Sequence, residues 1–392
     1  MFNKTPFLLL PLLIGSLIPS QQEGFCAEGT EEGDPNPAGL HLFQVESPFG
    51  FHTVLQEKYL RDGNNSIEKY AKGEAELSRP DALKVEWRAT KLSDKAKPNY
   101  TLTISENEDL SNPWVYSVNT NYAYVYNLKL ATRYYYSVQT TFGGKTSTSE
   151  KLWFRTENNM VRNLNLDGVI NVRDCGGWRN SDGQFMVKQG MLYRSGPFNR
   201  SNSSKVETTV SAEGRKEAAR LGIKTEIDLR EVKNNEVGGL KNNANSVLSY
   251  GSNSVKYIQA PINWANYSPH FLKDECSETL KTVFHTLADE SNYPVIFHCT
   301  AGTDRTGMIA YLVNGLLGVS EADLYRDYFF SLFSNIGLRY RKSIDDFYVA
   351  EIKKFPGATL QSKIFHALKD AGVPEEDLYK TYYLLQEEGY RI

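Results

Sequence analysis

The stretch from His298 to Gly307, His-Cys-Thr-Ala-Gly-Thr-Asp-Arg-Thr-Gly, places five residues between a cysteine and an arginine. A phosphate monoester carries about two negative charges, so attack on its phosphorus needs a strong nucleophile inside a nest of hydrogen-bond donors. Cys299 can supply that nucleophile, because the loop amides, the positive end of a following helix and Arg305 all favour its thiolate. The residues expected to hold the phosphate are Thr300, Ala301, Gly302, Thr303, Asp304 and Arg305.

The residues on either side of this loop are expected to support it. The hydroxyl of Thr306 lies within plausible reach of the sulfur, where a donor would stabilise the thiolate and later the leaving thiolate. Neighbours on a strand point to opposite faces, so His298 should turn away from the phosphate and hydrogen-bond the loop backbone. Because the loop amides and Arg305 can stabilise the negative charge of the phosphate, the sequence predicts neither a metal nor a cofactor.

The flanking segments predict a strand, a loop and a helix in the order that this chemistry needs. Residues 293–297 are a short apolar run that is typical of a buried parallel strand. From Met308 to Leu317 the apolar pattern is that of a buried helix, which ends at Gly318. This context favours a phosphate loop over a structural cysteine beside a solvated Asp-Arg pair.

The loop resembles the signature of the cysteine-dependent protein tyrosine phosphatase superfamily, His-Cys-x-x-Gly-x-x-Arg followed by Ser or Thr. Three further segments are similar to those of a bacterial branch of atypical tyrosine or dual-specificity phosphatases. They are Asn-Val-Arg-Asp-Cys-Gly-Gly at 171–177, Leu-Tyr-Arg-Ser-Gly at 192–196 and Ile-Asp-Leu-Arg at 227–230. That branch includes secreted tyrosine and lipid phosphatases, and the resemblance extends from about Val161 to the C-terminus. It implies a phosphomonoesterase that forms a phosphocysteine intermediate and acts on a phosphorylated protein or a small phosphomonoester, with phosphotyrosine as the first expected substrate.

One position departs from the family pattern. Members of that branch usually have Gly-Lys-Asp-Arg in the loop, and here the lysine position is Thr303. A lysine would add a second cation for multiply charged substrates such as phosphoinositide head groups. Its absence weakens the lipid interpretation and does not affect the hydrolysis of monoesters. A phosphoinositide or inositol-phosphate phosphatase stays an alternative, as do an inactive phosphate-binding protein and an adhesion or scaffold protein.

The general acid has two candidates. Many tyrosine phosphatases use an aspartate between the Asp-Leu-Arg strand and the cysteine strand. Here residues 260–267 hold no carboxylate, and Asp274 and Glu275 suit the start of a helix. The resemblance favours Asp304, geometry alone also allows Asp174, and both stay open.

The other motif residues are expected to brace the loop through hydrogen bonds and ion pairs. These residues are Arg173, Asp174, Arg194, Asp228 and Arg230, and Asp327, Tyr328 and Ser331 resemble the family's helix after the loop. Cys175 either fills the apolar position that the family gives to leucine or forms a reversible disulfide with Cys299.

Composition and the N-terminus indicate an exported protein with two domains. The chain has 392 residues, 40% hydrophobic and 23% charged, and its net charge of −3 gives no general attraction to nucleic acid or anionic membranes. Lys4 precedes an apolar run at 6–18 that is too short for a comfortable membrane span, so residues 1–27 are expected to be a cleavable signal peptide and the protein secreted or periplasmic. The sequence before Cys26 argues against a lipid anchor.

The two expected domains differ in their patterns. Residues 39–157 alternate like strands at 83–87, 100–105, 134–140 and 151–156, with a Gly143-Gly144 turn. This region resembles a fibronectin type III or immunoglobulin-like sandwich, because Trp87 lies on one of the strands and Leu128, Thr132 and Tyr134 have the spacing of a tyrosine corner. The sequence does not identify a binding partner for this domain. The tyrosine stripe could form a sugar-binding platform, although packing between strands explains it better.

The second domain, residues 158–392, is expected to be an α/β layered domain with a largely parallel sheet. Helices are predicted at 211–221 and 277–288, and a strand at 223–229. A polar loop at 234–254 and a mostly helical region at 321–385 complete the prediction.

Overall fold

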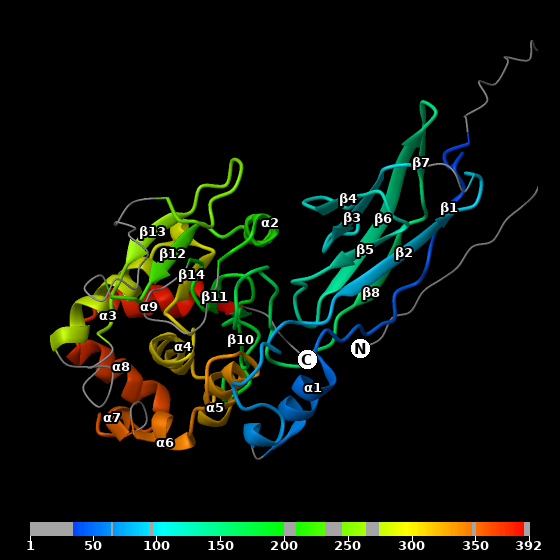
Figure 1. Ribbon diagram of the computed structural model, residues 1–392. Coiled ribbons are helices and arrows are strands. Elements are labelled where there is room, and N and C mark those ends of the chain that lie inside the picture. The colour runs from blue at the N-terminus through cyan, green and yellow to red at the C-terminus, as the bar shows by residue number, and fades with distance from the viewer. Residues whose placement is uncertain are drawn as a thin grey trace, which may run out of the picture. The chain divides into compact units, whose positions relative to one another are not determined.

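The computed structural model describes residues 34–63, 66–93, 97–199, 209–231, 245–263, 274–346 and 350–387 (Figure 1). The expected signal peptide with Cys26, residues 264–267 and most of the expected polar loop lie outside these ranges. The described residues from Asn36 onward belong to one compact unit. Among the described helices, none is long and apolar enough to cross a membrane.

The N-terminal part of this unit is built from two antiparallel β-sheets. One sheet has the order β1-β2-β5, and the other has the order β4-β3-β6-β7 with β8 also paired to β6. Alternate residues of both sheets are buried in a shared core around Trp87 and Tyr136. The strands are β1 (Leu40–Leu42), β2 (Leu83–Ala89), β3 (Tyr100–Ser105), β4 (Trp114–Val118), β5 (Tyr122–Val125), β6 (Arg133–Phe142), β7 (Lys145–Thr148) and β8 (Leu152–Arg155).

Several elements of this part were not predicted from the sequence, including β1, β4, β5, β7 and a helix. The Gly143-Gly144 turn leads into β7, whose polar Lys-Thr-Ser-Thr sequence has no hydrophobic alternation, and β8 follows it. Helix α1 (Val54–Arg61) is too short to give a helical period, although Thr53 and Gln56 form a capping box at its start. After it comes the 3₁₀ turn η1 (Ile67–Lys69).

The C-terminal part is an α/β layer with a five-stranded sheet of order β13-β12-β14-β11-β9. All neighbouring strands are parallel except β9, which pairs antiparallel with β11. The expected largely parallel sheet is therefore present. Its strands are β9 (Arg173–Asp174), β11 (Leu192–Ser195), β12 (Thr225–Asp228), β13 (Lys256–Gln259) and β14 (Val295–His298), while β10 (Met186–Val187) pairs with β15 (Gln386–Glu387).

Helices cover both faces of this sheet. Val295 and Phe297 of β14 are buried against α3 and α4, whereas Ile296 is buried with residues of α2. The helices are α2 (Ala212–Arg220), α3 (Asp274–Leu287), α4 (Asp304–Leu316), α5 (Glu321–Phe330), α6 (Arg341–Ile344), α7 (Ala350–Lys353), α8 (Leu360–Asp370) and α9 (Glu375–Leu384), with 3₁₀ turns η3 (Glu290–Asn292) and η4 (Ser331–Phe333). The predicted helices at 211–221 and 277–288 correspond to α2 and α3.

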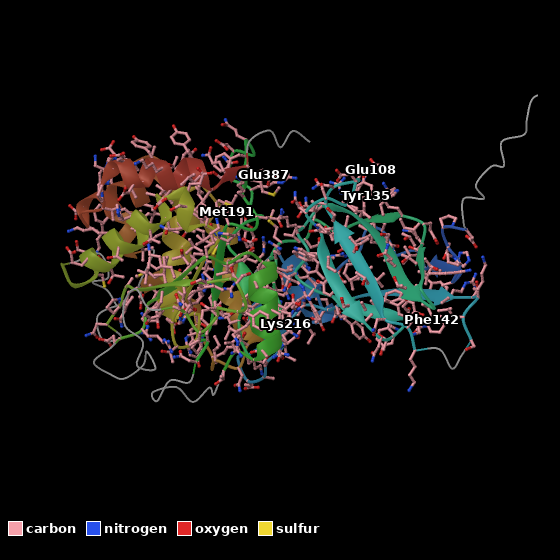
Figure 2. The ribbon with its side chains drawn as sticks, turned by 90° about the horizontal axis from the view of Figure 1, so that it is seen from above. Glu108, Tyr135, Phe142, Met191, Lys216 and Glu387 are labelled. Carbon is pink, nitrogen blue, oxygen red and sulfur yellow. The ribbon has the colours of Figure 1, made fainter. Side chains whose placement is uncertain are left out.

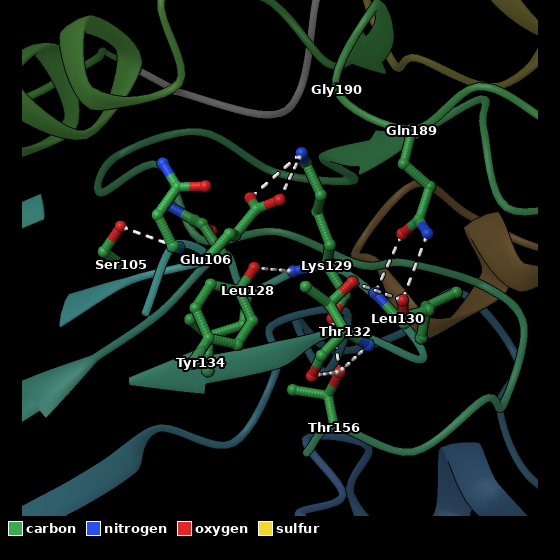
Figure 3. Close-up of polar contacts among 12 residues, drawn as sticks. Ser105, Glu106, Leu128, Lys129, Leu130, Thr132, Tyr134, Thr156, Gln189 and Gly190 are labelled. Atoms are coloured by element: carbon green, nitrogen blue, oxygen red, sulfur yellow. Dashed lines mark hydrogen bonds and ion pairs between the residues drawn. The ribbon is translucent and has the colours of Figure 1, made fainter. Parts of the chain in front are cut away.

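Polar contacts link the loop before β6 to the C-terminal part. The backbone N–H of Lys129 in this loop donates to the Tyr134 hydroxyl oxygen of β6 at 2.8 Å (Figure 3). The Gln189 side chain pairs with the backbone of Leu130, accepting at 2.8 Å and donating at 3.2 Å (Figure 3). Arg162 donates to the carbonyl oxygen of Leu128 at 3.0 Å. The expected domain boundary between residues 157 and 158 stays a prediction.

Candidate active site

The Cys299 loop lies between β14 and α4, as the sequence predicts. Strand β14 ends at His298, helix α4 begins at Asp304, and Cys299 is only 3% exposed. Gly302 has a φ of +69°, and a Cβ atom there would lie 2.4 Å from the carbonyl oxygen of Ser195. Only glycine fits this position, and a left-handed residue in such a loop turns successive N–H groups toward one side.

The outer side of the loop is braced through its carbonyl oxygens. The Asn171 amide donates to the carbonyl oxygen of Ala301 at 3.1 Å, and Arg194 Nη2 donates to that of Gly302 at 2.8 Å. Thr303 is fully buried, and its hydroxyl oxygen accepts from Asn171 at 3.3 Å. Thr303 therefore stabilises the loop from inside the protein, where a lysine could not take its place without displacing these contacts.

A buried aspartate on α5 holds the two arginines of the predicted motifs. Asp327 accepts from Arg173 Nε at 2.7 Å and from Arg194 Nη1 at 2.5 Å. Burial and the neighbouring Arg194 lower the pKa of Arg173 to about 10, against the attraction of Asp327. Burial alone would raise the pKa of Asp327, but the two arginines hold it below its ordinary value. Arg173 and Asp327 therefore stay charged near neutral pH, and Arg194 connects this cluster to the loop.

Arg305 is in position to close the phosphate nest. Its side chain is buried, and its Nη2 donates to the Thr300 hydroxyl at 2.9 Å across the loop. Its Nη1 donates to the carbonyl oxygens of Leu229 at 3.3 Å and Ile262 at 3.2 Å. These contacts place the guanidinium beside the loop, where a planar fork matches two phosphate oxygens.

His298 points away from the loop and hydrogen-bonds to a carboxylate that was not predicted from the sequence. Its Nε2 donates to Glu226 Oε1 at 2.8 Å, and its Nδ1 lies 3.4 Å from the carbonyl oxygen of Cys299. Glu226 belongs to β12 and is buried. All four residues of β12 are buried, so alternation does not distinguish Glu226 from its neighbours, and no spacing rule connects it to His298.

Asp228 and Arg230 form a second buried pair beside His298. Arg230 contacts both carboxylate oxygens of Asp228, and Tyr257 donates to the same carboxylate at 2.9 Å. Burial would raise the pKa of Asp228, but His298 and Arg230 hold it below its ordinary value. Glu226, Asp228 and His298 lie close enough to ligate an ion. They are engaged with one another and with the Arg230 cation, so the arrangement suits a structural network better than a metal site.

Both carboxylate oxygens of Asp304 accept hydrogen bonds from an arginine that was also not predicted from the sequence. Arg339 donates from Nε to Asp304 Oδ1 and from Nη2 to Oδ2, both at 2.8 Å, and the Tyr328 hydroxyl donates to Oδ1 at 3.1 Å. Arg339 lies in the irregular segment before α6, where no local pattern marks it. The Arg339 guanidinium therefore donates to both carboxylate oxygens of Asp304.

Asp174 and Thr306, the remaining predicted residues, differ in their contacts. Asp174 is fully buried, pairs with Arg162 at 2.5 Å and accepts from the backbone of Gly176 and Gly190, each at 2.7 Å. It therefore braces the fold. The Thr306 hydroxyl oxygen is buried and has no hydrogen-bond partner among the described residues, so its predicted role toward Cys299 stays a prediction.

No disulfide joins the cysteines of the described part of the chain. Cys175 and Cys299 are both buried, and burial raises the pKa of the Cys175 thiol. Cys175 also packs in the main hydrophobic core, which supports the interpretation that it fills an apolar position.

Comparison with known proteins agrees with this geometry. The model of a family described as the tyrosine phosphatase family matches residues 164–368, which is more than half of the chain. The chain belongs to the tyrosine phosphatase family. The matched residues contain the loop, Asp327 and the braces from Asn171 onward, so the family assignment and the site rest on the same segment.

Two relatives carry names of the same family. A tyrosine-protein phosphatase of Nostoc commune is 39% identical over 71 residues, which cover 18% of this chain and 21% of the relative. A Cupriavidus necator protein named as a putative tyrosine-protein phosphatase is 26% identical over 186 residues, covering 42% of this chain and 61% of the relative. The chain thus matches less than two thirds of the length of either relative.

Proposed function

We propose that this member of the family hydrolyses phosphotyrosine monoesters through a phosphocysteine intermediate. The observation that carries the proposal is the loop of residues 299–305, whose carbonyl oxygens bond outward to Asn171 and Arg194 while Arg305 lies across it. A loop held in this way presents its amides to a tetrahedral anion above the Cys299 sulfur. Cys299 is only 3% exposed, and a nucleophile so far from the surface suits the long aryl ester of phosphotyrosine.

In the first step the Cys299 thiolate attacks phosphorus. The P–S bond forms as the bond from phosphorus to the leaving oxygen breaks, and Arg305 with the loop amides stabilises the charge on the equatorial oxygens. In the second step water attacks the phosphocysteine, the P–S bond breaks, and the thiolate and inorganic phosphate are released. The hydrogen bond from His298 to Glu226 and the contact of its Nδ1 with the Cys299 carbonyl fix the start of the loop during both steps.

Asp304 is our proposed donor of the proton to the leaving oxygen. Asp174 is the weaker candidate, because it is fully buried and its oxygens are held by Arg162 and two amides. For Asp304 to donate, one of its carboxylate oxygens has to lose its hydrogen bond from Arg339 and take up a proton from solvent.

The nucleophile is tested with Cys299→Ser and with Cys276→Ser as a matched control, since Cys276 is also buried in the same core. Release of phosphate from p-nitrophenyl phosphate should disappear in the first variant and persist in the second. Mass spectrometry of wild-type protein quenched during turnover should find one phosphate on the Cys299 peptide. Activity that survives in Cys299→Ser would exclude the mechanism.

The acid and the substrate need separate measurements. Asp304→Asn should lose more activity toward phenyl phosphate than toward p-nitrophenyl phosphate, because the poorer leaving group depends more on proton donation. An equal loss for both esters would exclude Asp304 as the acid. A panel of phosphotyrosyl and phosphoseryl peptides, phosphoinositides and inositol phosphates should show preference for phosphotyrosine.

Two further proposals concern the rest of the chain. We propose export, supported by Lys4 and the apolar run at 6–18, and N-terminal sequencing of the protein recovered outside the cytoplasm tests it. We also propose that the N-terminal part with its two antiparallel sheets is a fibronectin type III-like sandwich. The two sheets with a shared core and the Lys129–Tyr134 hydrogen bond, which has the position of a tyrosine corner, support this proposal.

A further inference from the structure

We propose that the outer face of β6 and β8 binds an acidic oligosaccharide. Arg133 pairs with Arg155 and Tyr135 pairs with Trp153 in the register of these two strands. Side chains alternate along a strand, so all four of these residues project from the same face. The residues that alternate with them along the strands, Tyr134, Tyr136 and Phe154, are buried in the core on the opposite face. We call Arg133, Tyr135, Trp153 and Arg155 the β6–β8 face.

The charges on this face are uncompensated. Arg133 and Arg155 lie directly opposite each other, and like charges in that position destabilise a sheet. Neither arginine forms an ion pair within the described part of the chain, and both are exposed. The Arg133 guanidinium lies 4.6 Å from the centre of the Trp153 ring instead. An anion placed between the two guanidinium groups would relieve their repulsion.

The face opens into a hollow of about 580 Å³ that is large enough for a ligand. Arg133, Trp153 and Arg155 line it together with Ser47, Asn158 and Asn159. Glu157 lies there too, and its carboxylate accepts from the Asn159 amide at 2.6 Å. Arg61 also lines the hollow and pairs with Glu57, whereas Arg133 and Arg155 form no ion pair among the described residues. The hollow thus combines three arginines with hydroxyl and amide groups and one lining carboxylate, Glu157, that can accept from a hydroxyl.

This combination matches a sugar acid. The Trp153 side chain is 48% exposed, and a flat, half-exposed ring can pack against the apolar face of a pyranose. Guanidinium groups bind carboxylates through paired hydrogen bonds, and the asparagine amides can bind hydroxyls. Pro48 and Ala131 are the other apolar residues that line the hollow, too few to anchor a hydrophobic peptide side chain. A carbohydrate therefore fits better than a peptide.

The same pattern continues along β8 beyond the hollow. Lys151 Nζ lies 5.8 Å from the centre of the Tyr135 ring and donates to the carbonyl oxygen of Glu108 at 2.7 Å. Figure 2 shows Tyr135 beside Glu108 at the surface of the N-terminal part. Cations and aromatic rings thus alternate from residue 155 to residue 151, a distance of about 13 Å at the usual rise of a strand. An extended chain of uronic acids can contact several of them at once.

The test is calorimetric titration of the full chain with a galacturonic acid hexasaccharide and with neutral maltohexaose. We expect the acidic sugar to bind and the neutral sugar to bind far more weakly. Arg133→Gln, Arg155→Gln and Trp153→Ala should each weaken binding at least about tenfold, the size of a lost charge-assisted contact. Arg88→Gln is the matched control, because Arg88 is an exposed arginine of β2 outside the hollow. Hydrolysis of p-nitrophenyl phosphate should not change in any of the four variants.

Several results would overturn the proposal. These are an absence of hexasaccharide binding at millimolar concentration, equal binding of maltohexaose, equal binding of hexaglutamate, or an equal loss in Arg88→Gln. The melting temperature gives an independent readout without ligand. Arg155→Gln should raise it, because the substitution removes a like-charge pair, and a lower melting temperature would show that the two arginines support the fold instead.

Discussion

The Asp327 carboxylate couples the stability of the fold to the shape of the phosphate loop, and Asp327→Asn tests that coupling. The side chain of Asp327 is 7% exposed, and those of Arg173 and Arg194 are each 1% exposed. An asparagine amide keeps one acceptor but turns a donor toward the second guanidinium. One buried arginine then loses its carboxylate, and removal of one partner from a buried ion pair costs about 3–5 kcal/mol. We expect a loss of about 3 kcal/mol, out of a typical total of about 5–15 kcal/mol.

Urea unfolding measures this loss, and Asp323→Asn is the control. Asp323 lies on the same helix and pairs with Arg326, but the two side chains are 28% and 20% exposed. Such surface pairs contribute less than about 1 kcal/mol. The reasoning about burial is wrong if the two variants lose equal stability.

The same variant should also impair catalysis in the fraction that is folded. Arg194 donates both to Asp327 and to the carbonyl oxygen of Gly302, so an unpaired Arg194 no longer fixes the loop. A displacement of about 1 Å at a reacting centre can cost about a hundredfold in rate. We expect kcat/KM for p-nitrophenyl phosphate to fall by about that factor at 15 °C, well below unfolding. An unchanged kcat/KM would mean that Asp327 stabilises the fold without positioning the loop.

Three other predictions concern pH, a glycine and the ion pair between Arg339 and Asp304. Because the two arginines lower the pKa of Asp327, its stabilisation is present above the unfolded value of about 3.9 and is lost as pH falls through the folded value. The difference in unfolding free energy between wild type and Asp327→Asn should therefore shrink below pH ~4. Gly302→Ala should abolish phosphatase activity, while Gly183→Ala, at a similar φ of +72° with open space around it, should keep it; equal activities would refute the steric argument. Arg339→Met should lower the unfolding free energy by about 2 kcal/mol, measured by urea unfolding. A double-mutant cycle with Asp304→Asn should give a coupling free energy of about 1–3 kcal/mol. Additive effects of the two substitutions would show that the ion pair between Arg339 and Asp304 contributes little.

The local sequence was sufficient to predict the elements that carry the nucleophile. An apolar run, a glycine-containing loop and an apolar helix determine the geometry from Val295 to Leu316 through short-range effects, and the structure has β14 and α4 there. The strands around Trp87 and Tyr134 followed from alternation in the same way. Helix α1 was missed because eight residues give too little periodicity, and its position depends on Tyr59, whose hydroxyl donates to the carbonyl oxygen of Arg326 at 3.0 Å.

The partners of the site residues could not be predicted in this way. Glu226 and Arg339 lie far along the chain from His298 and Asp304, and no spacing rule connects them. The resemblance favoured Asp304 as the general acid and geometry alone also allowed Asp174, but only the folded chain shows that Arg339 binds Asp304 and Arg162 binds Asp174.

The sequence by itself determined which chemistry is present, because Cys299, Gly302 and Arg305 are neighbours in one short loop. Tertiary structure decided how that loop is held, because Asn171, Arg194 and Asp327 approach it from different strands and helices. It also decided that Arg133 and Arg155 face each other, since strand register is set by pairing between segments and not by either segment alone. Residue type and local spacing determine which groups are available, whereas hydrogen bonding between distant segments determines which of them meet.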